Sequence, residues 1–185
     1  DVVDELRRIA KEVRDRLREI VERLDRIAKE VVKENEEVVR HNDELAKRVV
    51  TTAKRIVDEV KDKETVKRRI DRIAEKVEED TKEHEDRSKR SEEDVERVVK
   101  KIREEVKEIV DRVEKFVKEV RDSGTDSEEV KRVVETVRKL LRDAEKEIEE
   151  VVKKVRDLLR RVNKELKESV ERVRRLLEEV RERAR

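Results

Sequence analysis

The feature that most constrains this chain is the spacing of its apolar residues, which recur at alternating intervals of three and four along three long stretches. That interval is the period of one face of an α-helix. The sequence has one Gly and no Pro, the two residues that are least favourable inside helices. The pattern therefore predicts an all-α protein. The same spacing assigns Thr52 and Phe116 to the buried face of their helices.

Two polar segments separate the three apolar stretches. The segment 122–129 reads Asp-Ser-Gly-Thr-Asp-Ser-Glu-Glu and contains the single glycine, Gly124. Glycine can end a helix in the left-handed conformation, and Asp126 or Ser127 can cap the helix that follows. The segment 61–65 is polar throughout. Both segments are predicted to be short connections between helices.

The three predicted helices have nearly the same length. Helices of equal length with short connections are typical of up-down-up bundles. We therefore expect an elongated, antiparallel, coiled-coil-like bundle of three helices in a single domain of residues 1–185. The predicted helices span about 1–60, 63–121 and 126–184.

An alternative arrangement has four helices. Residues 78–94 contain no apolar side chain, and Ser91-Glu-Glu-Asp resembles the start of a helix. If the chain turned back at Ser88–Ser91, half of each long helix would expose its apolar face. A dimer would then have to cover that face.

The neutral polar residues favour three continuous helices. Folding the chain with turns near residues 62 and 124 brings nine of these residues to one level of the bundle. In the four-helix alternative, Asn163 would lie beside about residue 23, where no neutral polar residue is near. We name the nine residues the polar layer: Asn35, His41, Asn42, Thr81, His84, Ser88, Ser91, Asn163 and Ser169.

Most of the polar layer occupies positions that the apolar spacing assigns to the core. A buried polar group without a partner costs about 1–3 kcal/mol, so clustering lets such groups satisfy one another. We predict a buried hydrogen-bond network centred on His41, His84, Asn42 and Asn163. Two alternatives stay open at this point: a partly hydrated layer and an open polar groove.

Charge patterning excludes several function classes. Charged residues make up 58% of the chain, yet the net charge is +1 and the two signs alternate throughout. Nucleic-acid recognition needs a basic face, and a membrane span needs about 20 consecutive apolar residues. We expect neither partner. No targeting signal is visible, so the localisation is unknown, and recombinant expression is the expected source.

Catalytic and metal chemistry has little support in the sequence. The chain has no Cys, no Gly-rich phosphate loop and no serine on a strand-to-helix turn. An acid precedes each histidine by four residues, Glu37 before His41 and Asp80 before His84. No Glu-x-x-His motif repeats as in metal-binding bundles. We expect no enzyme activity, no metal site and no cofactor.

Taken together, these features resemble those of de novo designed helical bundles with buried hydrogen-bond networks. The resemblance lies in the equal helices, the loop 122–129, the Glu/Lys/Arg surfaces and the single polar layer. Heavy use of Val over Leu departs from the pattern. The resemblance implies a thermostable scaffold with no natural activity and no required partner. Its alternative is an interaction module, or a switchable or oligomeric component, that binds a partner helix or a second copy.

Overall fold

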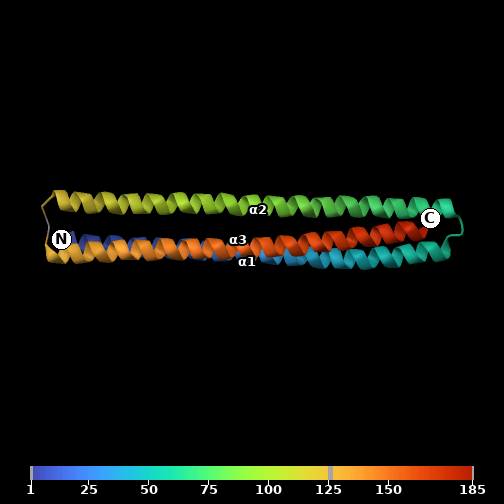
Figure 1. The fold of residues 1–185 in the computed structure, drawn as a ribbon, viewed down its shortest axis with the longest axis horizontal. Helices are drawn as coiled ribbons and strands as arrows, with labels where there is room; N and C mark the ends of the chain where they lie inside the picture. The colour runs from blue at the N-terminus through green and yellow to red at the C-terminus, as the bar shows by residue number, and fades with distance from the viewer. Residues whose placement is uncertain (1, 125–126, 185) are drawn as a thin grey trace. The chain divides into compact units, whose positions relative to one another are not determined.

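The computed structural model describes residues 2–124 and 127–184 of the chain. They form three α-helices, which are α1 (Val2–Glu59), α2 (Lys63–Asp122) and α3 (Glu128–Ala184) (Figure 1). No strand occurs in these two ranges. The predicted all-α class with three helices of about 60 residues is confirmed. The expected helical residues Asp1 and Asp126 lie outside the described ranges.

The helix α2 continues through Ser88 and Ser91 without a break, so the four-helix alternative is wrong. Residues 78–94 contain no Gly or Pro. The Ser91 hydroxyl also donates to the carbonyl oxygen of Arg87 at 3.1 Å. A serine that bonds to the carbonyl four residues earlier is compatible with a continuing helix.

Both connections carry the local signals that end and restart a helix. Asp62 caps α2, because its carboxylate accepts from the Glu64 backbone N–H at 3.3 Å and the Thr65 hydroxyl at 2.8 Å. Gly124 has a φ of 77° and follows the end of α2, as in many helix C-termini. Ser127 caps α3, since its hydroxyl accepts from the Val130 backbone N–H at 3.2 Å.

The chain divides into two compact units, and each contains a segment of all three helices. The first unit comprises residues 1–28 and 94–157, and the second comprises residues 29–93 and 158–185. The expectation of a single domain stays a prediction. The two units are described separately below.

The core of the first unit is apolar. Among its described residues, every buried side chain is Leu, Ile, Val or Ala. The largest fully buried ones come from all three helices: Leu6, Leu24, Val99, Ile102, Val117, Val137 and Val152. Burial of each such side chain stabilises the fold by about 1.5–3 kcal/mol.

Paired arginine–glutamate contacts show that α2 and α3 run antiparallel in the first unit. The Arg156 guanidinium donates to both oxygens of Glu96 at 2.9 and 3.0 Å. Seven residues further along α2, Arg103 donates to Glu149, which lies seven residues back along α3, at 3.2 and 3.0 Å. A third pair of the same kind joins Arg138 to Glu114 at 3.3 and 3.2 Å.

The second unit has two apolar clusters near the connection of α1 with α2. One contains Val49, Ala74, Val77, Val173 and Leu177, and the other contains Ala53, Ile56, Val66, Ile70 and Val180. Ion pairs again relate α2 to α3: Arg174 lies 3.6 Å from Glu78, and Arg181 lies 3.7 Å from Asp71. In this unit too, a step of seven residues back along α2 matches seven forward along α3.

Thr52 and Phe116 are among the side chains that the spacing assigns to the core and that the structure does not bury. Thr52 is exposed, and its neighbour Ala53 takes the core position at 3% exposure. Phe116 is half-buried, while Val117 is 1% exposed. Because a straight α-helix has 3.6 residues per turn, its buried face drifts relative to a strict seven-residue repeat.

Candidate functional site

All nine residues of the polar layer belong to the second unit. The contributions are Asn35, His41 and Asn42 from α1, the four residues Thr81, His84, Ser88 and Ser91 from α2, and Asn163 and Ser169 from α3. All nine residues lie within regular α-helix, so the packing and register of the three helices decide which of their side chains meet.

Three contacts between helices fix the register at this level. The His41 and His84 rings lie with their centroids 5.6 Å apart. The Ser88 hydroxyl donates to Asn163 Oδ1 at 2.7 Å. On the α1–α3 side, the Arg172 guanidinium lies 3.7 Å from the Asp43 carboxylate.

Asn42, Thr81 and Ser169 share one level of the second unit, with one residue from each helix. Each lies within three positions of a residue that makes one of these three contacts. All three are almost completely buried, at 0%, 0% and 1% exposure. They therefore place a polar side chain from every helix inside the core.

The rest of the polar layer extends from the core toward the surface. Asn35 is buried at 5% exposure. His84, Ser88, Ser91 and Asn163 are half-buried, and His41 is exposed. His41 directly precedes the buried Asn42, and neighbouring residues of a helix point about 100° apart. The expected burial of His41 therefore does not occur.

Hydrogen bonding within the polar layer is uneven. Thr81 satisfies its hydroxyl within its own helix, by donating to the Glu78 carbonyl oxygen at 3.0 Å. The Ser88–Asn163 bond joins two helices. Several buried atoms have no hydrogen-bonding partner in residues 2–124 and 127–184: Asn35 Nδ2, both amide atoms of Asn42, His84 Nδ1 and Ser169 Oγ. The full interhelical network stays a prediction.

The two histidines form an edge-to-face pair, with their ring planes at 83°. Burial lowers the pKa of His84, and the neighbouring His41 ring lowers it further. Asp80 and Glu83 oppose this shift and Arg87 adds to it. The balance favours a neutral His84 imidazole at neutral pH.

The histidine pair borders a groove of about 480 Å³ between α1 and α2. Five residues that line this groove were noted from the sequence, namely Asn35, Glu37, the two histidines and Ser91, whereas Glu34 and Arg87 were not. Helical spacing could have found them, since Glu34 lies seven residues before His41 and Arg87 lies three residues after His84, and both spacings place residues on one face of a helix. The lining residues are Glu34, Asn35, Glu37, Val38, His41, His84, Arg87 and Ser91.

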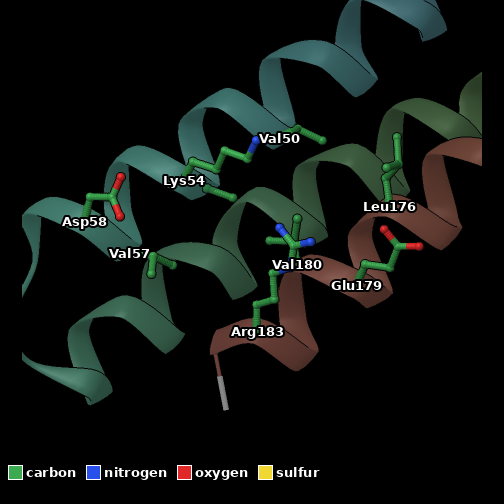
Figure 2. Close-up of a pocket in the computed structure, with 9 residues that line it drawn as sticks. Val50, Lys54, Val57, Asp58, Leu176, Glu179, Val180 and Arg183 are labelled. Atoms are coloured by element: carbon green, nitrogen blue, oxygen red, sulfur yellow. The ribbon is translucent and has the colours of Figure 1, made fainter.

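Two further grooves of the second unit flank α3. One, of about 590 Å³, lies between α2 and α3 and includes Ser88 and Asn163. The other, of about 470 Å³, lies between α1 and α3 (Figure 2). Val50, Val57, Leu176 and Val180 line it, with charged side chains at its edges. Val57 is 44% exposed, more than any other large hydrophobic side chain of the described ranges.

The described residues contain neither a cluster of metal ligands nor a membrane-spanning helix. No group of three or more His, Cys, Asp or Glu side chains has the proximity to hold a metal ion. No helix within the described ranges has a stretch that is long and apolar enough to cross a bilayer.

Comparison with known proteins identifies the fold and no family. No known protein family matches the sequence, and no curated protein matches it. Among solved structures, the chain is similar to a computationally designed three-helix bundle. The two are 18% identical, with a TM-score of 0.61 over 99% of this chain and 92% of the other. At this identity the similarity establishes the three-helix bundle fold alone.

Proposed function

We propose that this chain is a designed structural scaffold without catalytic activity, whose packing is specified in part by the polar layer. The observation that carries the proposal is the concentration of buried polar side chains. Within the described residues, Asn35, Asn42, Thr81 and Ser169 are the buried polar ones, and all lie in a short stretch of the second unit. The designed bundle of the same fold supports this reading.

Such a layer favours one packing of the helices because the alternative packings have a higher free energy. In the proposed arrangement, Asn42, Thr81 and Ser169 lie at one level. Thr81 keeps its bond to the Glu78 carbonyl oxygen in any register, but a displaced helix would bring Asn42 and Ser169 against Val, Ile or Leu, away from the other polar side chains with which they could pair. Single buried polar residues fix register and association state in coiled coils in the same way, at some cost in stability.

The experiment that tests the proposal removes the four buried members of the polar layer. A variant with Asn35→Leu, Asn42→Leu, Thr81→Val and Ser169→Ala keeps similar side-chain volumes in an apolar core. We expect the original chain to show one mass near its 22.3 kDa in light scattering and one set of amide signals in NMR spectra. The variant should resist denaturant better, yet show additional oligomers or conformers.

The result that contradicts the proposal is equally definite. If the variant shows the same single mass and one set of sharp signals, the layer does not specify the packing. A matched control converts four neutral or charged surface positions to other polar residues. That control should leave both measurements unchanged.

A second candidate function is an interaction module that binds a partner helix or a second copy. The observation that favours it is the α1–α3 groove in Figure 2, where Val57 exposes apolar surface in a groove that Val50 and Leu176 also line. Light scattering over a hundredfold range of concentration separates the two candidates. A mass that doubles, and that returns to 22.3 kDa in a Val57→Lys variant, would favour the interaction module.

A further inference from the structure

We propose that His41 and His84 form a two-histidine site for a divalent transition-metal ion such as Zn²⁺, in the α1–α2 groove of the second unit. This inference is independent of the proposed scaffold function. The sequence-based expectation of no metal site rested on the absence of a repeated Glu-x-x-His motif, although the predicted register already placed the two histidines at one level. The structure brings their rings together from two helices.

The distance between the two rings suits shared coordination. Their centroids lie 5.6 Å apart. Two imidazoles that bind one tetrahedral Zn²⁺ with Zn–N bonds of about 2.0–2.1 Å have ring centroids roughly 5 Å apart. The separation of the two rings is therefore close to the value that shared coordination needs, and the His41 ring is exposed.

The hydrogen bonding of His84 leaves it available as a ligand. Metal ions bind an unprotonated imidazole nitrogen. His84 Nδ1 is buried with no hydrogen-bonding partner in the described ranges. No described hydrogen bond to Nδ1 therefore fixes the tautomer, and the coordinating nitrogen can be the unprotonated one.

The charges around the groove favour a cation. Glu34 and Glu37 of α1 line it beside the histidines. On α2, the carboxylates of Asp80 and Glu83 act on His84, and Arg87 opposes them. No residue of α3 lines this groove. Two carboxylates and one guanidinium thus line the groove, Asp80 and Glu83 add negative charge near His84, and Glu37 lies one helical turn from His41 on the same face.

The structure also limits the affinity of this site for a metal ion. No cluster of three or more protein ligands is preformed in the described residues. Two histidines would hold the ion, with water or a reoriented carboxylate at the remaining positions. We therefore expect weaker binding than at a four-ligand structural zinc site.

The test is a titration of the full chain with ZnCl₂ at pH 7.5, followed by calorimetry and by NMR of the histidine ring nitrogens. The matched control combines His41→Asn with Arg48→His. It keeps two histidines on the same two helices and separates them by two turns. Both substituted positions are exposed, so folding is preserved.

We expect the original chain to bind one equivalent of Zn²⁺, and the ring signals of His41 and His84 to move together. The control should bind at least tenfold more weakly. Zn²⁺ should raise the guanidinium midpoint of the original chain and not that of the control.

Two results would overturn the proposal. One is equal affinity of the original chain and the control, which would assign binding to scattered surface carboxylates. The other is a shift in the signals of only one histidine at one equivalent of Zn²⁺. Either result leaves the proposed scaffold function unaffected, because that proposal is tested without metal.

Discussion

Replacing Asn42 by Leu should make the protein more stable, although the change removes a polar residue from the predicted network. Asn42 is 0% exposed, and neither its Oδ1 nor its Nδ2 has a hydrogen-bonding partner in the described residues. Burying an unpaired polar group costs about 1–3 kcal/mol. Leu has the same number of heavy atoms and the same branching, so overpacking is small.

The expected gain can be estimated from these two contributions. Relief of the unpaired amide contributes at least about 1 kcal/mol, and burial of a leucine side chain contributes about 1.5–3 kcal/mol. After allowance for some local repacking, we expect the free energy of unfolding to rise by about 2–4 kcal/mol. Guanidinium unfolding followed by circular dichroism measures the change directly.

A second variant provides a control of opposite sign. Asn163 accepts a hydrogen bond from Ser88 at 2.7 Å, so Asn163→Leu leaves that hydroxyl without its partner and should cost about 1 kcal/mol. If Asn42→Leu instead lowers the stability by more than about 1 kcal/mol, Asn42 has a hydrogen-bonding partner and the reasoning fails.

Three further predictions concern other positions. Ser88→Ala should cost about 0.5–1.5 kcal/mol, the typical contribution of one hydrogen bond; an unchanged denaturant midpoint would show that the Ser88–Asn163 bond contributes nothing. The pKa of His84 is lowered in the folded protein, so the unfolded chain takes up its proton first as the pH falls below about 6.5. The contribution of His84 to the free energy of unfolding should therefore be constant above that pH, decline below it and level off under the folded pKa, and His84→Asn should remove it. If the denaturant midpoints of the original chain and of His84→Asn change in parallel from pH 7.5 to 5, the shift is contradicted. Gly124 has a φ of 77°, and Gly124→Ala should cost about 1 kcal/mol through backbone strain, whereas Asp122→Ala at the exposed last residue of α2 should cost less; equal losses would mean that the positive φ is not required.

The sequence was sufficient to predict the helices because periodicity and end signals agree. The three-and-four spacing, the caps at Asp62 and Ser127 and the glycine at 124 act locally. Each of these signals depends on nearby residues alone, and the structure has helices that begin and end beside them.

The details of burial could not be read from the same pattern. The spacing places Asn42 on the buried face and His41 one position off it, and the prediction that His41 is buried came from the proposed network. Phe116 and Val117 are different, because the spacing assigns Phe116 to the buried face and only the crossing of the helices decides that Val117 is buried instead. The pairing of Ser88 with Asn163 depends on side-chain rotamers as well as register, and no linear spacing contains that information.

The arginine–glutamate pairs of the first unit have a consequence for how α2 and α3 can align. In these pairs α2 contributes a glutamate at Glu96 and at Glu114, but an arginine at Arg103 between them, so the sign of the charge alternates along α2. If α2 slid by two turns along α3, Glu96 would face Glu149 and Arg103 would face Arg142, so attraction would become repulsion. Surface charges that add little to stability can thus oppose a misaligned pairing in the unit that has no described buried polar side chain.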